Sequence, residues 1–196
     1  MSGDTGVSPA GFIVRVPVAF AGLHSCYAMS RRSEVSAGIL AYRRNSRGLE
    51  ILLAHPGGPY WRNKDAGAWS IPKGLVESGD PLTCAKREFN EETGLTANGK
   101  FMPLKPIRQK SGKTVHAFAL EGDYDLTAFS SNSFDMEWPP HSGKKQSFPE
   151  VDRISYFKLA TARRKILPAQ RPFIEELVKR LKEEPAPATG VRPSAR

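Results

Sequence analysis

The sequence predicts one α/β domain, in which strands form a sheet and helices pack against it. Three observations indicate this class: short apolar runs with strand composition, one amphipathic helix in the middle of the chain, and a second near its end. A chain of 196 residues is long enough for one domain with a full core and tails. We expect the domain over residues 34–183, an N-terminal extension over 1–33 and a disordered tail over 184–196.

The domain begins with a predicted hairpin of two apolar strands. These strands cover residues 36–42 and 49–55, and residues 45–48 between them have turn composition. A polar loop that contains two aromatic residues follows over 60–68. Residues 69–74 then form a short strand that runs into a turn.

The central helix has a marked start and a marked end. Asp80 is a good N-cap, and Pro81 suits the first helical position. Gly94 stands where a left-handed C-terminal cap is expected. The helix therefore runs over about 81–93. Its apolar side, which packs on the sheet, consists of Leu82, Ala85 and Phe89.

The second half of the domain continues the sheet and adds helices. Further strands are predicted over 101–109, 114–120 and 154–159. A short helix is predicted over 160–165, and a longer one over 168–181, where apolar residues recur at helical spacing. Residues 123–150 are polar and are expected to be rich in loops, with Trp138-Pro139-Pro140 at the centre.

The chain is strongly basic, with a formal net charge of +9. A basic surface favours an anionic ligand such as a polyphosphate or a nucleic acid, although the same charge also serves simple solubility. Cys26 and Cys84 form neither a disulfide framework nor a metal set, so we expect reduced thiols in a cytoplasmic protein. The apolar stretch over 11–29 is interrupted by Arg15, so we expect no membrane segment there. We expect the working chain to begin near Met29, which stands just before the first predicted strand.

The most informative feature is a cluster of three glutamates on the central helix. Glu88, Glu91 and Glu92 are related by i, i+3 and i+4 spacing, so they share one helical face. Like charges placed this close repel each other, and a divalent cation reverses that effect. Carboxylate oxygens are the ligands that Mg²⁺ and Mn²⁺ prefer, and a metal held this way can bind phosphate at its open positions. The cluster therefore predicts a Mg²⁺ or Mn²⁺ site that acts on a phosphate compound.

The sequence around this cluster resembles the signature of the Nudix hydrolases. That signature is a glycine, an isolated acid, and then Arg-Glu-apolar-x-Glu-Glu-x-Gly-apolar. Its second half is filled at every specified position, by Arg87, Glu88, Phe89, Glu91, Glu92, Gly94 and Leu95. The resemblance covers roughly residues 35–182 and implies an α/β/α sandwich with a mixed β-sheet between helices. It also implies Mg²⁺-dependent hydrolysis of a phosphoanhydride bond in a nucleotide.

The first half of the signature departs from the family pattern. The family usually has seven residues between the isolated acid and the arginine, whereas six separate Asp80 from Arg87. The loop is therefore one residue short, and the isolated acid is either Glu77 or Asp80. Gly74 fills the glycine position, where we expect it to let the backbone turn tightly.

The resemblance also implies roles for the acidic and basic residues of the motif. Glu88, Glu91 and Glu92 are expected to hold the metal, and one of them also to position the attacking water. Arg87 is expected to pair with a neighbouring carboxylate. Glu150 precedes a predicted strand, where some Nudix enzymes place an extra acid near the metals. The alternative for Glu150 is a solvated loop acid.

Several residues outside the helix are candidates for binding substrate. Lys73 is placed beside the motif and is a candidate to reach a phosphate. Tyr60, Trp61 and Trp138 are candidates to stack on a purine, with core packing or loop anchoring as the alternative. A phosphate-binding rim is predicted from Gln109, Lys110, Lys113, Lys144 and Lys145, although a lone lysine is more often only solvated. Structural rather than catalytic roles are expected for His55 and His116.

The signature indicates the reaction class and leaves several substrates open. Our first expectation is a dinucleoside polyphosphate such as diadenosine tetraphosphate, cleaved to ATP plus AMP, because the Pro72-Lys73-Gly74 approach resembles that branch of the family. The second is a nucleoside triphosphate pyrophosphohydrolase, including one that acts on oxidised purine nucleotides. The third is removal of pyrophosphate from RNA 5′ ends, with the basic surface gripping the strand. A non-catalytic nucleotide-binding sensor is the alternative of another class.

Overall fold

The computed structural model of the chain describes residues 34–110 and 112–183. The predicted extension over 1–33, which contains Cys26 and Met29, lies outside the described residues, as does the predicted tail over 184–196. Every helix within the described ranges is too short or too polar to span a bilayer.

The centre of the fold is a seven-stranded mixed sheet. Its strands are β1 (Val35–Asn45), β2 (Gly48–Pro56), β3 (Lys73–Leu75), β4 (Phe101–Pro103), β5 (Ile107–Arg108), β6 (Thr114–Glu121) and β9 (Val151–Lys158). The main path runs in the order β4-β6-β1-β2-β9, and β3 and β5 pair with β1 and β6, respectively. β1 and β6 are parallel, and the other pairs are antiparallel.

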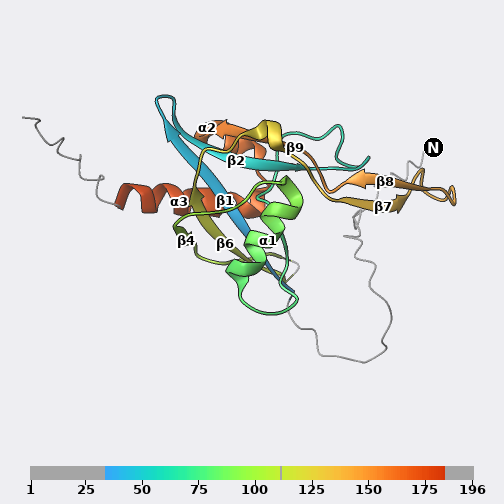
Figure 1. Cartoon of the computed structure of the whole chain (residues 1–196), viewed down its shortest axis with the longest axis horizontal. Coiled ribbons are helices and arrows are strands. Elements are labelled where there is room, and N and C mark those ends of the chain that lie inside the picture. Colours follow the sequence, from blue (N-terminus) through green and yellow to red (C-terminus); the bar gives the residue numbers. More distant parts are fainter. Residues whose placement is uncertain (1–33, 111, 184–196) are drawn as a thin grey trace, which may run out of the picture.

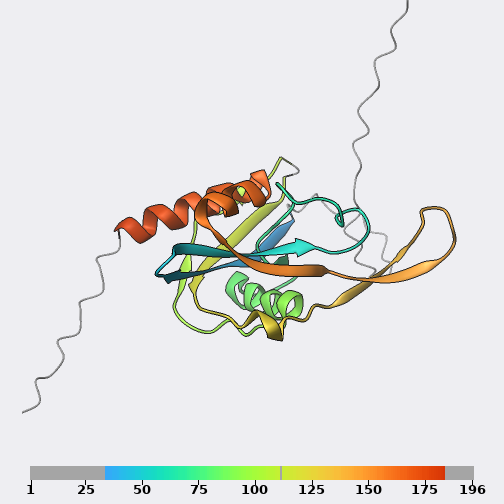
Figure 2. The same cartoon turned by 90° about the horizontal axis from the view of Figure 1, so that it is seen from above.

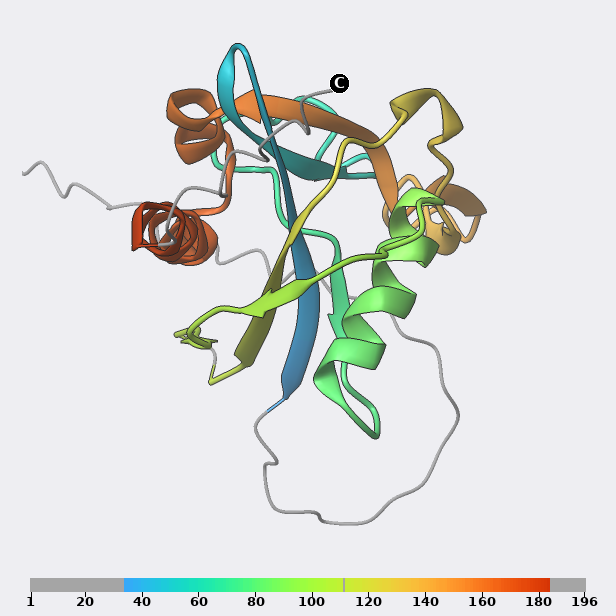
Figure 3. The ribbon, with the colours of Figure 1, turned by 60° about the vertical axis from the view of Figure 1, so that its left-hand side comes forward.

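Helices cover both faces of this sheet, as Figures 1 and 3 show. α1 (Pro81–Thr93) lies on one face, and α2 (Leu159–Lys165) and α3 (Arg171–Glu183) lie on the other. Two 3-10 turns are also present, η1 (Leu126–Ala128) and η2 (Pro168–Gln170). The predicted α/β/α sandwich with a mixed sheet between helices is confirmed.

The strands β1 and β2 are buried on both faces of the sheet. Successive side chains of a strand point to opposite faces, so neighbouring residues pack against different helices. In β1, Ile39 packs toward α1, and its neighbour Leu40 packs toward α3. β2 repeats this pattern with Leu52 and Leu53. Phe89 of α1 is fully buried in the core between α1 and the sheet, together with Ile39 and Leu52. Burial of a side chain of this size contributes about 1.5–3 kcal/mol relative to leaving it exposed, so packing holds α1 firmly on the sheet.

α1 begins and ends where the sequence predicts. The Asp80 carboxylate accepts a hydrogen bond from the backbone N–H of Thr83 at 2.9 Å, and Pro81 is the first helical residue. Gly94 follows the helix in the left-handed conformation, with φ of 71°, and its N–H donates to the carbonyl of Asn90 at 2.7 Å. Both ends of the helix are therefore satisfied, which sets where its glutamates lie along the sheet.

Two predicted strands differ from the observed ones. The strand expected over 69–74 begins later, as β3, while Trp69 and Ser70 form only isolated bridges. The strand expected over 101–109 is broken into β4 and β5. Pro103 and Pro106 stand at this break, and proline has no N–H to donate to a neighbouring strand.

The segment over 123–150 contains a two-stranded hairpin, so the loop prediction for it was wrong. The strands are β7 (Ser133–Glu137) and β8 (Lys145–Pro149), which form a separate antiparallel sheet. Figure 2 shows the hairpin projecting from the body of the domain. Both strands are only five residues long, and most of their residues are exposed and polar, which made them resemble a polar loop.

His55 is a buried structural residue of β2. Its ring is fully buried, with Nδ1 2.7 Å from Oδ1 of Asp152 and Nε2 2.7 Å from the backbone oxygen of Lys64. The ring also packs edge-on against Trp69, with centroids 5.1 Å apart. His55 therefore ties β2 to β9 and to the loop that follows β2.

We expect His55→Ala to lower the free energy of unfolding by about 2–4 kcal/mol, because it opens a cavity in the core and removes the His55 hydrogen bonds to Asp152 and to the backbone oxygen of Lys64. Urea unfolding measures this loss. His116→Ala, on the half-buried side of β6, is the control and should cost less. A loss of turnover at unchanged stability would contradict the structural role of His55.

Candidate active site

One cleft in the described structure gathers most of the predicted site residues. It has a volume of about 370 Å³ and is lined by α1, β3, the loop after β2 and the base of the β7–β8 hairpin. Its lining combines carboxylates, basic side chains and apolar rings. The charged residues that line it are Lys73, Glu77, Arg87, Glu88, Glu92, Lys113 and Glu150.

Arg87 holds two of the predicted metal ligands. Its Nη2 lies 2.5 Å from Oε1 of Glu88, and its Nη1 lies 2.8 Å from Oε2 of Glu91. Glu88 lines the cleft and its side chain is only 14% exposed, whereas Glu91 is 36% exposed and is not part of the lining. Arg87 therefore offsets part of the negative charge concentrated on α1.

Glu92 contacts the strand beneath α1. Its Oε2 accepts a hydrogen bond from the backbone N–H of Lys73 at 3.1 Å. Burial raises the pKa of Glu92 to about 7, against the opposing effect of Lys73. The charges of Glu88 and Glu150 add to the rise. The ionised form of Glu92 is therefore unfavourable in the metal-free protein.

Gly74 makes room for the Glu88 carboxylate. A Cβ atom at position 74 would overlap that carboxylate, which lies directly against the glycine backbone. Gly74 is part of β3 and pairs with Ala37 of β1, and its φ is not positive. The glycine is therefore required by close approach, and the tight turn expected there was wrong.

Glu150 joins the cluster from a distant part of the sequence. Its backbone N–H donates to the carbonyl of Asn132 at 2.8 Å, and its own carbonyl accepts from the N–H of Gly57 at 2.9 Å. Its side chain lines the same cleft as Glu88 and Glu92. Burial raises the pKa of Glu150, and the charge of Glu91 adds to this effect.

Lys73 and Lys113 place two positive charges in the same cleft. The Nζ of Lys113 lies 3.9 Å from Oε2 of Glu34, which is a loose ion pair. Burial lowers the pKa of Lys113, and repulsion from Lys73 lowers it further. Two ammonium groups that repel each other are stabilised by an anion between them, so this pair suits phosphate.

The aromatic candidates lie on the loop after β2 and on the hairpin. Tyr60 and Trp61 line the cleft. Trp138 does not, and its ring packs edge-on against Tyr60 with centroids 5.4 Å apart. Phe134 and Met136 of β7 also line the cleft, and the sequence analysis missed them. The signal was their alternation with acidic residues, which is a strand pattern.

Four of the five predicted rim residues lie away from this cleft. Gln109 and Lys110 are in the turn between β5 and β6, and Lys144 and Lys145 are on the distal part of the hairpin. None of these four lines the cleft, whereas Lys113 does. The positive charge near the carboxylates therefore comes from fewer residues than the sequence predicted.

The two candidates for the isolated acid have different surroundings. Asp80 caps α1 and does not line the cleft, whereas Glu77 does. This arrangement favours Glu77 as the acid that corresponds to the first half of the motif.

Cys84 is a free, buried thiol that donates to the carbonyl of Leu75 at 3.2 Å, so its contact is with the motif loop.

The donor set of the cleft fits a divalent cation. Among the residues that the structure describes, no three carboxylate, imidazole or thiolate groups already converge as a finished metal site. Glu88, Glu92 and Glu150 nevertheless line one cleft, and burial raises the pKa of each. Oxygen donors whose negative charge is unfavourable without a counter-charge are suited to Mg²⁺ or Mn²⁺.

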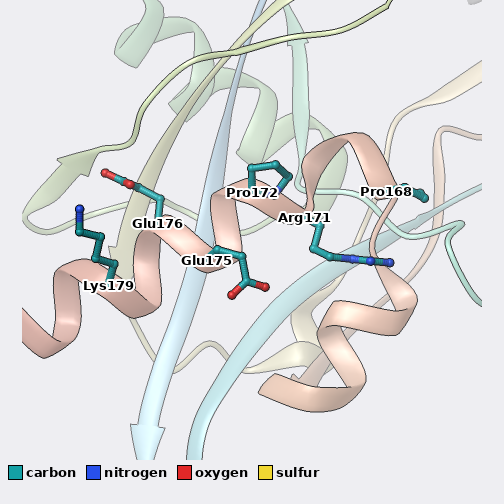
Figure 4. Close-up of a pocket in the computed structure, with 6 residues that line it drawn as sticks. All are labelled: Pro168, Arg171, Pro172, Glu175, Glu176 and Lys179. Atoms are coloured by element: carbon teal, nitrogen blue, oxygen red, sulfur yellow. The ribbon is translucent and has the colours of Figure 1, made fainter.

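A second hollow of about 410 Å³ runs along the outer side of η2 and α3 (Figure 4). Its labelled side chains point in different directions and do not converge. Glu175 is paired with Arg163 at 2.6 Å, and Glu176 with Arg180 at 3.1 Å. The acidic groups of this hollow are therefore already neutralised, and it does not share the chemistry of the cleft.

A family model of the NUDIX domain matches residues 32–177. The chain belongs to the Nudix family. Nudix hydrolases act on nucleoside diphosphates linked to another group and generally use a divalent metal such as Mg²⁺. The chain is accordingly a Nudix-type pyrophosphohydrolase, and α1 lies within the matched residues.

Solved structures share this fold at low sequence identity. C. elegans Ap4A hydrolase in a binary complex has 20% identity and a TM-score of 0.54, with 76% of this chain and 99% of that chain covered. The NUDIX domain of Shewanella oneidensis NrtR complexed with ADP ribose has 15% identity and a TM-score of 0.54, with 78% and 90% covered. A mutT/nudix family protein from Listeria innocua has 18% identity and a TM-score of 0.54, with 78% and 97% covered. A comparison with curated protein sequences finds no significant match.

We expect Gly74→Ala to reduce kcat by roughly 10²-fold, because the new methyl group displaces the Glu88 carboxylate from its place. The melting temperature should change little, since the displaced atoms are the far end of a flexible side chain. Steady-state kinetics and thermal melting measure the two effects. The double variant Gly74→Ala, Glu88→Gln should be no slower than Glu88→Gln alone. Additive losses in the double variant would show that Gly74 acts through another residue.

The usual pKa of a glutamate, about 4.5, is raised to about 7 for Glu92 in the folded protein. We therefore expect the free energy of unfolding of the metal-free protein to fall as the pH rises through this range. The folded state binds this proton more tightly than the unfolded state, so deprotonation favours unfolding. The shift corresponds to on the order of 3 kcal/mol. Urea unfolding in a chelator at pH 5 and pH 8 measures it. Glu92→Gln should remove most of the decline, whereas the exposed Glu137→Gln should leave it unchanged. An equal decline in both variants would contradict the assignment.

Proposed function

We propose that this Nudix enzyme hydrolyses a phosphoanhydride bond of a nucleoside polyphosphate with Mg²⁺ as its metal, Mn²⁺ being able to replace it. Our best candidate is diadenosine tetraphosphate, cleaved to ATP plus AMP. One observation carries the proposal: a single cleft combines partly buried carboxylates, two mutually repelling lysines and aromatic side chains. These three groups suit a metal, a chain of phosphates and a base, respectively.

In this proposal the carboxylates of α1 hold the metal. A bound Mg²⁺ neutralises phosphate charge and lowers the pKa of a coordinated water. Glu88, Glu91 and Glu92 would supply the oxygen ligands, and one of these carboxylates would also orient the attacking water. Glu150 would serve as a further acid beside them. Arg87, which now pairs with two of these side chains, would keep them in position.

The remaining lining residues would bind the substrate itself. Lys73 and Lys113 would contact the phosphates, because both side chains line the cleft and the ion pair of Lys113 with Glu34 is loose. Tyr60 and Trp61 would stack on a base, and Trp138 would support the ring of Tyr60. The Pro72-Lys73-Gly74 approach to the motif supports a dinucleoside polyphosphate over the other candidates.

We further propose that residues 34–183 form the hydrolase domain and that the protein works in the cytoplasm. The family match over 32–177 and the packing of α3 on the sheet support these boundaries. The free thiol of Cys84 is in keeping with a reducing compartment.

A substrate panel with Mg²⁺ tests this function. The panel contains diadenosine tetraphosphate, nucleoside triphosphates with and without oxidised purines, ADP-ribose and RNA with a 5′ triphosphate. ATP plus AMP as products of diadenosine tetraphosphate would support the first candidate. Pyrophosphate plus a monophosphate from a triphosphate would support a triphosphate pyrophosphohydrolase instead. Nucleotide binding without turnover in Mg²⁺ or Mn²⁺ would overturn the proposal in favour of a sensor.

We expect Glu91→Gln and Glu92→Gln each to lower kcat by about 10²–10⁴-fold, because each removes a charged oxygen ligand or the group that orients water. Circular dichroism should show an intact fold in both variants. Glu121→Gln is the control, since Glu121 pairs with Arg44 and does not line the cleft. Near-normal rates in both α1 variants would remove these glutamates from the proposed metal site.

A further inference from the structure

The β7–β8 hairpin presents an apolar face to the cleft. Side chains directly opposite each other in an antiparallel pair share a face, and alternate residues along a strand point the same way. Phe134 lies opposite Phe148, and Met136 lies opposite Gln146. Phe134 and Met136 are partly buried and line the cleft, whereas Asp135 between them is exposed. The hairpin therefore contributes a two-residue apolar surface to the site that holds the carboxylates.

The base of the hairpin is fastened to the catalytic helix. The backbone N–H of Asn132 donates to the carbonyl of Glu91 at 3.0 Å, and the N–H of Glu150 donates to the carbonyl of Asn132 at 2.8 Å. The N–H of Val151 donates to Oγ of Ser131 at 3.0 Å. These bonds link the segments on both sides of the hairpin to the end of α1. The distance from the apolar surface to the carboxylates is therefore set by backbone contacts.

Ring contacts hold the same hairpin against the loop that follows β2. Phe134 packs over Gly58, where an added Cβ would lie 3.3 Å from the ring. Further out, Trp138 packs against Tyr60. Tyr60 and Trp61 line the cleft from the loop side, so the loop and β7 face the same space. The apolar side chains of the loop and of β7 therefore line one cleft of about 370 Å³.

Phe134 packs across the hairpin on Phe148, with ring centroids 6.3 Å apart, and also lines the cleft together with Met136. β7 and β8 pair only with each other, and an isolated two-stranded hairpin is marginally stable in water. Phe134 and Met136 belong to neither of the two described cores. Their exposed apolar area can be buried by a ligand in the cleft, and this burial is favourable.

We propose that Phe134 and Met136 form a platform on which a base of the substrate stacks. The inference rests on the proposed function, because the ligand is taken to be a nucleotide whose phosphates lie at the carboxylates. Neither side chain carries a hydrogen-bond donor, so the platform recognises a flat apolar face rather than a pattern of polar groups. It therefore favours purines over pyrimidines by their larger face and discriminates little between adenine and guanine.

Equilibrium binding tests the platform without requiring turnover. The two probes are an ATP analogue with methylene groups in place of its bridging oxygens, and inorganic tripolyphosphate, each measured by calorimetry with Mg²⁺. Phe134→Ala should weaken the nucleotide by roughly 5–150-fold, the range expected for loss of one stacked base. Met136→Ala should weaken it less. Tripolyphosphate has no base, so its affinity should be unchanged in both variants.

Two further variants separate stacking from the shape of the hairpin. Phe134→Trp keeps an aromatic face and should bind the nucleotide more tightly than Phe134→Ala does, with an affinity close to that of the wild type. Asp135→Ala lies on the opposite face of β7 and should bind both probes as the wild type does. The platform is overturned by equal weakening of both probes in Phe134→Ala, by unchanged nucleotide affinity, or by a wild type that prefers tripolyphosphate.

The outcomes for the platform and for the hydrolase function are distinguishable. Selective weakening of nucleotide binding in Phe134→Ala, in a protein that hydrolyses no member of the substrate panel, would support the platform and overturn the proposed function. Hydrolysis of a nucleotide with a normal KM in Phe134→Ala would support the function and overturn the platform.

Discussion

The site depends on holding several carboxylates close together against their mutual repulsion. Glu88, Glu92 and Glu150 line one cleft, and burial raises the pKa of each of them. The fold tolerates this because α1 is held by interactions that do not involve its charges. The helix is capped at both ends, and Phe89 is buried in the core beneath it. A divalent cation would relieve this repulsion, and Nudix hydrolases generally use such a metal.

The two sides of the cleft are built from different kinds of secondary structure. The α1 carboxylates stand on a regular helix that packs against β3 and β1, so their relative positions are defined by the core of the domain. The opposite side of the cleft consists of a loop and a projecting hairpin, which are fixed by hydrogen bonds at their base and by ring contacts. Groups that react need accurate placement, whereas groups that bind a base need only present a suitable surface. Under the proposed function, the α1 side would therefore serve the chemical step, and the side formed by the loop and the hairpin would select the substrate.

The sequence was most informative where the interactions are local. The glutamates of α1 and the caps at both helix ends lie within one continuous segment, so spacing alone predicted their shared face. The role of Gly74 depends on the Glu88 side chain that packs over it, a contact between separate elements that local patterns do not contain. Phe134 and Met136 were missed because their strand is short and pairs only with another short strand. Lys113, rather than Lys110, lines the cleft because of how the β5–β6 turn is placed, which spacing cannot define.

The balance of charge in the cleft predicts that binding of phosphate and binding of metal are coupled. Four carboxylates and three basic side chains line the cleft, so without a metal it has no excess of positive charge. The whole chain, in contrast, carries a net charge of +9. That overall charge attracts a polyanion to the protein surface, but it does not supply a strong local field at the reacting phosphates. A divalent cation reverses the balance at the same carboxylates that are unfavourable without it. Under the proposed function, these carboxylates would therefore affect both the affinity for substrate and the rate of the chemical step.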